Sequence, residues 1–511
     1  MPESFTKERV ILHFGAVDQI AEVYVNDMLV GKHEGGYLPF SLDVTATVKK
    51  GQSNRLVVKV TDTLDRKYPY GKQCKKRGGM WYTPVSGIWQ SVWLENVAET
   101  YIEKVVLTPD MEGVNIALQI NNITEKDSGA ANEEGKNPAG FKVIVELSNG
   151  EIFEKQFTGR EGRIMLSEHV DKSGQKYIPK LWSVDNPHLY NMKIVTDTDE
   201  VETYFALRKI DIQNINGVNR VCLNNKPIFM HGVLDQGYFC DGIFLPAEPE
   251  EYERDILRMK ELGYNMLRKH IKVEPEAFYY YCDKHGMLVM QDMVNNGGYS
   301  FIFDTALPTI GMKTRSDVKN NENETMRIFK EHTKETIEHL YNHPSIVAYT
   351  IFNEGWGQFN SDEMYNFVKH LDETRLVDST SGWFAQKKND FDSEHIYFKT
   401  TPPIIGERPT FVSECGGYSQ VIEGHYFSKY NTYGYGSSED SEALTDMIVA
   451  MYEEMIFSGL EKGICGCIYT QLSDVEDEVN GLYTYDRKVC KVNVEKMQRM
   501  SERLKDSSKL R

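Results

Sequence analysis

The first part of the chain alternates short apolar runs with polar turns and shows no helical period. Successive residues of a strand point to opposite faces, so runs of this kind predict strands. The runs within residues 1–100 predict a β-sandwich, and a second series within residues 101–213 predicts a small immunoglobulin-like sandwich. The clearest of these runs are 10–14, 22–25, 55–60, 91–94, 104–107, 114–120 and 141–147.

After about residue 217 the pattern changes, because apolar strands now alternate with amphipathic helices. This alternation is typical of parallel β/α units. Pro249 and Gly263 mark the predicted start and stop of the first helix, while no clear helix follows the fifth or sixth strand. Eight strands close a barrel, so residues 214–511 are predicted to form a (β/α)8 TIM barrel. The eight candidate strands are 228–230, 265–268, 287–290, 346–351, 376–378, 395–397, 410–412 and 464–469.

The composition narrows the possible partners and the compartment. Acidic residues outnumber basic ones by 76 to 58, and the net charge of −18 argues against binding to nucleic acid or to an anionic membrane. The eight cysteines lack the paired spacing of a zinc site, which favours a reducing compartment. Because we see no signal-peptide segment and no long apolar run, the chain as given is predicted to be cytoplasmic.

Two predicted barrel strands end in the same way, with a glutamate followed closely by glycine. These are Glu354 before Gly355, and Glu414 two residues before Gly416. Residues at the carboxyl ends of barrel strands converge on one mouth. Two carboxyl groups about 5 to 5.5 Å apart are what a retaining glycosidase needs. For one such glutamate, capping of the next helix is the simpler interpretation; two of them favour catalysis.

Other predicted strand ends supply polar and aromatic groups that suit a sugar ring. Arg268 can keep a nucleophile ionised, and Asn353 can bind the hydroxyl next to the anomeric carbon. A satisfied hydrogen-bond network in the core explains some of the others nearly as well, namely His270, Asp292 and His395. The predicted substrate-binding residues are Arg268, His270, Asn353, Asp235, Asp292, Trp383, His395 and Tyr469.

A metal site is a weaker interpretation of the same region. His231, Asp235, His270 and Asp292 could cluster, but no HExxH motif or His/Cys pair at ligand spacing accompanies them. We therefore predict no metal and no cofactor. Cys415 stands beside Glu414, and packing explains it better than nucleophilic catalysis does.

These motifs resemble glycoside hydrolase family 2, which contains β-galactosidases, β-glucuronidases and β-mannosidases. The resemblance implies that residues 1–100 are a jelly-roll sugar-binding domain, that Glu354 is the acid/base and that Glu414 is the nucleophile. It assigns Arg268, His270, Asn353 and Trp383 to the supporting shell. The motifs that carry it are Gly87-Ile88-Trp89, Val92-Trp93-Leu94, Asn186-Pro187-His188-Leu189-Tyr190, Asn265-Met266-Leu267-Arg268, Phe352-Asn353-Glu354 and Glu414-Cys415-Gly416-Gly417.

The chain departs from the family pattern in three places. Tyr469 stands where strand eight usually offers a tryptophan as the sugar platform. The Asn-x-Lys signature that grips a carboxylated sugar in β-glucuronidases is not evident, although Lys272 or Arg408 could replace it. The family normally has further strands before Arg9, so we expect an incomplete, N-terminally truncated first sandwich with an exposed strand edge.

The leading hypothesis is a retaining, exo-acting β-glycosidase with a carbohydrate substrate, and β-galactosidase is its favoured specificity. A first alternative is β-glucuronidase or another specificity of family 2. A second is a catalytically inactive carbohydrate-binding protein of the same fold. Association into a homo-oligomer is left open by the sequence.

Overall fold

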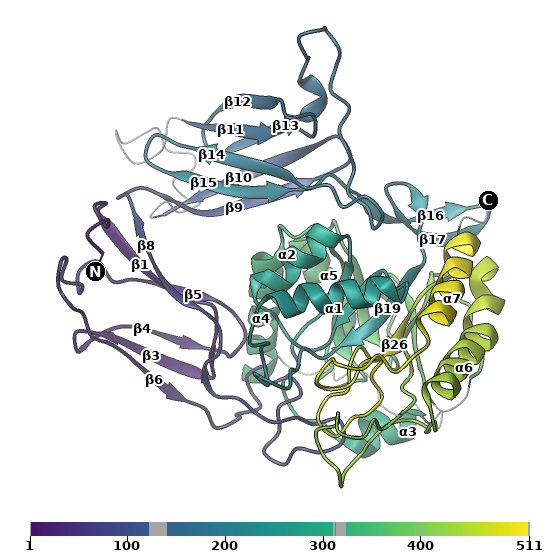
Figure 1. Cartoon of the computed structure of the whole chain (residues 1–511). Coiled ribbons are helices and arrows are strands. Elements are labelled where there is room, and N and C mark those ends of the chain that lie inside the picture. Colours follow the sequence, from purple (N-terminus) through teal and green to yellow (C-terminus); the bar gives the residue numbers. More distant parts are fainter. Residues whose placement is uncertain (1, 122–139, 310–311, 313–322, 398–399, 509–511) are drawn as a thin grey trace.

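The computed structural model describes residues 2–121, 140–309, 312, 323–397 and 400–508. Two β-sandwiches occupy the first part of the chain, and a barrel of parallel strands surrounded by helices occupies the remainder (Figure 1). This is the predicted fold class.

The first sandwich is built from small antiparallel sheets with the strand orders β5-β1-β8, β4-β3-β6 and β2-β7. Its strands bury alternate residues, as β3 does with Ala21, Val23 and Val25. These side chains pack with those of β1 into a separate apolar core. The strands are β1 (Arg9–Phe14), β2 (Val17–Asp18), β3 (Ile20–Val25), β4 (Met28–Glu34), β5 (Phe40–Asp43), β6 (Leu56–Thr61), β7 (Gly87–Ile88) and β8 (Val92–Val97).

Strand β8 forms one edge of its sheet, since β1 is its partner in that sheet's order. Its apolar residues are unusually exposed: Val92 is 37% exposed, Trp93 47% and Leu94 39%. An apolar edge strand of this kind can pair with another chain.

The second sandwich packs the sheet β13-β10-β9 against the sheet β12-β11-β14-β15. A hairpin of β16 and β17 then leads into the barrel. The strands are β9 (Ile102–Pro109), β10 (Gly113–Ile120), β11 (Gly140–Glu146), β12 (Ile152–Thr158), β13 (Glu161–Met165), β14 (Tyr190–Val195), β15 (Glu200–Phe205), β16 (Ile210–Ile215), β17 (Val218–Leu223) and β18 (Lys226–Pro227).

Eight parallel strands form the barrel, in the order β23-β22-β21-β20-β19-β26-β25-β24. Its strands are β19 (Met230–Asp235), β20 (Met266–Lys269), β21 (Leu288–Asp292), β22 (Ile346–Asn353), β23 (Leu376–Ser381), β24 (Asp392–Ile396), β25 (Thr410–Gly416) and β26 (Ile464–Thr470). Its helices are α1 (Glu250–Glu261), α2 (Glu276–His285), α3 (Leu307–Thr309), α4 (Glu324–Leu340), α5 (Ser361–Leu371), α6 (Ser441–Met451) and α7 (Val494–Ser508).

The barrel closes through side chains where β23 meets β24, since these two strands are the ends of the hydrogen-bonded order. Ser393 Oγ donates to Asp378 Oδ2 at 2.7 Å, and Ser381 Oγ lies 2.9 Å from His395 Nε2. The last contact also holds a histidine at the carboxyl ends of the strands.

The two ends of the barrel differ in chemistry. An apolar cluster at the amino ends of the strands contains Met230, Met266 and Leu376, and it packs against Trp182 of the second sandwich. Polar side chains gather at the carboxyl ends instead. The barrel can therefore be stable at one end and reactive at the other, as is general for this fold.

The eight predicted strands are all present, but the first one was placed too early. Ile228 hydrogen-bonds to Val221 of the β17 hairpin, and β19 begins only at Met230. His231 and Asp235, which the predicted strand 228–230 would place after its end, therefore lie within β19. Helix α1 lies between Pro249 and Gly263 as predicted.

No helix in the described part of the chain is long and apolar enough to cross a membrane.

Candidate active site

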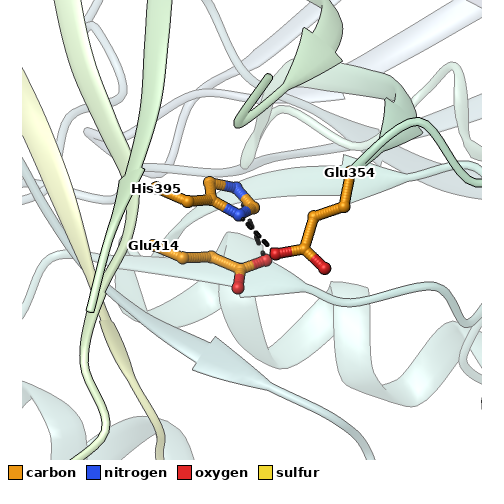
Figure 2. A group of neighbouring side chains, drawn as sticks. All are labelled: Glu354, His395 and Glu414. Carbon is orange, nitrogen blue, oxygen red and sulfur yellow. Dashed lines mark hydrogen bonds and ion pairs between the residues drawn. The ribbon is translucent and has the colours of Figure 1, made fainter. Parts of the chain in front are cut away.

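The two glutamates predicted to be catalytic lie together at the carboxyl ends of the barrel strands. Glu354 follows β22 directly, and its positive φ of 54° begins a turn that continues at Gly355. Glu414 lies within β25 and is 4% exposed. Figure 2 shows both carboxyl groups directed toward the ring of His395.

His395 connects the two carboxyl groups. Its Nδ1 lies 2.8 Å from Glu354 Oε1, and its Nε2 lies 3.7 Å from Glu414 Oε1 (Figure 2). One ring nitrogen and one oxygen from each carboxyl group all lie within 4.8 Å of one another. The two acids therefore face a common space.

Arg268 holds one side of this space. It is fully buried at the end of β20 and donates from Nη1 to Glu414 Oε1 at 3.0 Å. Its Nη2 donates to Asn353 Oδ1 at 2.8 Å, and its Nε donates to Asp292 Oδ1 at 3.0 Å. One guanidinium thus orients residues from three other strands, because its planar set of donors can bond several acceptors at once.

Asp292 also orients His270, whose Nδ1 lies 2.7 Å from Asp292 Oδ2. Burial lowers the pKa of His270, and the hydrogen bond to Asp292 opposes that effect. With Nδ1 engaged by Asp292, Nε2 is the ring nitrogen that remains available. His270 and Asp292 therefore do belong to a buried hydrogen-bond network, and Arg268 connects that network to Glu414.

The surroundings of Glu414 favour its ionised form. Burial alone would raise its pKa, but the charges of His395, Arg268 and His270 and a hydrogen bond from Tyr397 lower it to about 2. Tyr397 donates its hydroxyl proton to Glu414 Oε2. A carboxylate held in this state is available as a nucleophile.

An aromatic wall borders the two acids. Trp383 lies edge to face with His395, with ring centroids 5.4 Å apart, and its Nε1 donates to Asp304 O at 2.9 Å. Tyr397 stacks on Tyr435 at 4.3 Å. Aromatic faces of this kind pack against the apolar face of a sugar ring.

Two predicted binding residues lie outside this hydrogen-bonded group. Asp235 accepts from Lys269 Nζ at 2.6 Å, so its carboxylate already has a buried cation as partner. Tyr469 is 1% exposed, and its ring packs against Gly416, where an added Cβ would come within 2.4 Å of it. The next residue, Thr470, faces Tyr397 instead, at 3.1 Å.

The structure separates the residues that were considered for a metal site. His231 bonds to the hydroxyl of Tyr452 at 2.9 Å, while His270 and Asp292 pair with each other. Within the described residues, the set of donors close enough to share an ion is Glu354, His395 and Glu414.

Several residues at the site were not predicted. Tyr397 could have been found, because it stands two positions after His395 in the sequence, and residues at that spacing in a strand share a face. Tyr435, which stacks on Tyr397, and Lys72, whose charge acts on His270, come from loops, and Glu478, which accepts from Tyr82 OH at 3.0 Å, follows β26 in a loop. No sequence signal places these loops at the barrel mouth.

Comparison with known proteins supports one family over three adjacent segments. Models of "Glycosyl hydrolases family 2, sugar binding domain", "Glycosyl hydrolases family 2" and "Glycosyl hydrolases family 2, TIM barrel domain" match residues 1–98, 100–208 and 214–403. A β-galactosidase of Thermoanaerobacter pseudethanolicus is 27% identical over 389 residues, which is 73% of this chain and 46% of that protein. The chain spans about half the length of the curated relatives that it matches first.

Solved structures share the fold at low sequence identity. A β-D-glucuronidase of Dictyoglomus thermophilum superposes with a TM-score of 0.72 at 18% identity, covering 99% of this chain and 88% of that one. A β-galacturonidase of Eisenbergiella tayi superposes with a TM-score of 0.67 at 19% identity, covering 97% of this chain and 88% of that one. With all three of its segments matched in order, the chain belongs to glycoside hydrolase family 2.

Proposed function

We propose that this chain is a retaining, exo-acting β-glycosidase. The observation that carries the proposal is the approach of Glu354 and Glu414, with one oxygen of each and the intervening imidazole within 4.8 Å. A separation of about 5 Å suits direct attack by one carboxylate, whereas an inverting enzyme needs about 6.5 to 9.5 Å to admit a water molecule.

The two acids have different surroundings, which suggests different roles. Glu414, with a pKa of about 2, is the nucleophile: its carboxylate forms a bond to the anomeric carbon as the glycosidic bond breaks. Glu354, hydrogen-bonded to His395, gives its proton to the departing oxygen. In the second step Glu354 takes a proton from water, and that water displaces the sugar from Glu414 with net retention.

The neighbours of the acids supply binding groups for the sugar. The amide oxygen of Asn353 accepts from Arg268, so the amide nitrogen is the group that can donate to a sugar oxygen near the anomeric carbon. Trp383 supplies a rigid apolar surface whose indole nitrogen is already bonded to Asp304. Loops of the first sandwich reach the barrel mouth, where Tyr82 OH donates to Glu478 at 3.0 Å. A mouth bounded in this way suits the removal of a terminal sugar.

The identity of the sugar is a separate question from the reaction. The β-galactosidase relative supports the galactoside hypothesis, and the fold shared with a glucuronidase and a galacturonidase is equally consistent with a sugar acid. A catalytically inactive binding protein is the competing hypothesis from another class. It predicts sugar binding without turnover.

The test is hydrolysis of a panel of β-linked nitrophenyl glycosides by wild type and by Glu354→Gln and Glu414→Gln. We expect turnover by wild type and a loss of at least about 1000-fold in each variant, with unchanged thermal unfolding. Glu363→Gln on the exposed face of α5 is the matched control and should retain full activity. Activity that survives in both active-site variants would refute the assignment.

A further inference from the structure

A segment of the first sandwich reaches the barrel mouth and carries Lys72 with it. Tyr70 N donates to Asn295 O, just past β21, at 3.1 Å. Gly71 packs so closely on the loop after β20 that an added Cβ would lie 2.9 Å from Ile271 O, one residue past His270. On the far side, Tyr82 N donates to Lys72 O at 3.0 Å. The Lys72 backbone is thus fixed by contacts on both sides.

The Lys72 ammonium group is half-buried and has no hydrogen bond or ion pair with another described residue. It nevertheless acts on two groups of the site. Burial has the largest effect on the pKa of His270, followed by the hydrogen bond to Asp292. The charge of Lys72 has the third largest effect and lowers that pKa. Burial raises the pKa of Glu478 to about 7, and the Lys72 charge is the largest influence that opposes this rise.

The other candidate cations are already occupied. Lys272 Nζ donates to Gly237 O and Phe244 O, both at 2.6 Å, and pairs with Glu274. Arg408 precedes β25 and bonds to Asp392 at the first residue of β24, so it lies at the opposite end of the barrel. Arg268 already donates four hydrogen bonds, to Asp292, Asn353, Glu414 and the backbone oxygen of Ser413.

The strand order shows which part of a substrate Lys72 would meet. In a ring of eight strands, β26 lies opposite β22, and Glu478 follows β26 while Glu354 follows β22. The acid/base marks the side of the leaving group. Tyr82 links Lys72 to this side of the mouth, since its backbone N donates to Lys72 O and its hydroxyl donates to Glu478 Oε1, both at 3.0 Å. Lys72 therefore comes to the mouth on the side of β26, where the sugar that stays on the enzyme would lie.

We propose that Lys72 binds the carboxylate of a sugar acid, so that the substrates are β-linked uronides. This inference rests on the proposed function, because it assumes a glycoside between Glu354 and Glu414. Those two side chains, Asp292 and Glu478 make the mouth rich in carboxyl groups, and an anionic sugar would be repelled there without a cation to receive it. An ammonium group that is half-buried and forms no hydrogen bond or ion pair within the described part of the chain is the group that meets this need. The competing view is that Lys72 only balances the acidic mouth.

The experiment compares pairs of nitrophenyl substrates that differ only in a primary alcohol or a carboxylate: β-galactoside with β-galacturonide, and β-glucoside with β-glucuronide. Wild type should prefer one of the uronides over its neutral partner. Lys72→Met should lower kcat/KM for that uronide by at least about 30-fold and change it less than about 3-fold for the neutral sugar. Lys72→Arg should restore part of the uronide activity. Lys75→Met, an exposed lysine of the same loop, is the matched control.

The outcomes separate the two proposals. A wild type that cleaves neutral sugars and not uronides, or an equal loss on both members of a pair in Lys72→Met, overturns the Lys72 assignment and leaves the glycosidase intact. If wild type cleaves no glycoside, the proposed function fails, and binding of free galacturonic and glucuronic acid by calorimetry still decides the role of Lys72. Tighter binding of either acid than of galactose or glucose, lost in Lys72→Met with unchanged thermal unfolding, supports it; equal binding overturns it.

Discussion

Arg268→Met should change the ionisation of Glu414, the proposed nucleophile, in a measurable way. Arg268 is fully buried, and its Nη1 lies 3.0 Å from Glu414 Oε1. Methionine keeps much of the side-chain length and apolar packing while it removes the charge and the donors. Burial, which disfavours the ionised form of Glu414, would then be opposed only by the remaining partners, among them His395, His270 and Tyr397.

The size of the effect follows from the contact. At 3.0 Å, two unit charges attract by about 5 to 6 kcal/mol at an effective dielectric constant of about 20. Removal of one partner of a buried pair typically costs about 3 to 5 kcal/mol, which corresponds to about 2 to 4 pKa units. The pKa of Glu414 should therefore rise from about 2 into the range of about 4 to 6. Because the carboxylate attacks only when ionised, the acidic limb of kcat/KM should move into the same range.

The sign of the stability change is also defined. The pKa of Glu414 is below its ordinary value of 4.5 in the folded protein, so its ionisation stabilises the fold above that value, and the gain disappears as the pH falls toward 2. Arg268→Met should lose this gain at neutral pH.

The assay is a profile of kcat/KM from about pH 3 to pH 9 on whichever nitrophenyl glycoside wild type cleaves, since this quantity reports the pKa values of the free enzyme. Arg375→Met is the control: Arg375 is buried and pairs with Asp372 at 3.0 Å, just before β23 at the amino end of the barrel. It should destabilise the protein without moving the acidic limb. An unchanged limb in a folded Arg268→Met protein would refute the reasoning.

Three further results are expected. Tyr397→Phe should lower kcat/KM by about 10- to 100-fold, because a hydrogen bond to a charged group is worth about 1.5 to 3 kcal/mol, and a change of less than about 2-fold would show that the hydroxyl does not assist Glu414. Burial alone would lower the pKa of His343, but neighbouring carboxylates raise it to about 10, so the stability it contributes is complete below about pH 6.5 and disappears as the pH rises through 10. Urea denaturation should therefore show a larger deficit for His343→Gln at pH 6 than at pH 10, and an equal deficit would contradict this. Dialysis against EDTA should leave activity unchanged, since the two carboxylates that we propose to be catalytic already have protein partners; a loss restored by one divalent cation would show that they bind a metal.

Much of the fold was predictable because the period of the apolar residues changes along the chain. Buried strands such as β22 and β26 consist largely of apolar residues, and helix stripes separate the strands. Strand ends were less certain. The run 228–230 belongs partly to a hairpin contact between Ile228 and Val221, which local sequence does not reveal.

The site was predictable where it depends on strand position and not where it depends on loops. Glu354 directly follows β22, and Glu414 lies two residues before the end of β25, so their convergence follows from the barrel itself. Tyr469 was predicted to bind the sugar, but it is the next residue, Thr470, that contacts Tyr397. Neighbouring residues of a strand point to opposite faces, so a shift of one residue exchanges the two faces. Lys72 reaches the mouth through contacts more than a hundred residues distant in sequence, such as Tyr70 with Asn295, and no local pattern encodes such an arrangement.

Formation of a covalent bond between Glu414 and the sugar is the central step of the proposed mechanism. The direct measurement is mass spectrometry of the protein after brief reaction with a fluorinated β-glycoside that slows the second step, followed by digestion to locate the added mass. We expect one glycosyl group per chain, on the peptide that contains Glu414, and none in Glu414→Gln. An adduct on another residue, or turnover with inversion and no adduct, would contradict it.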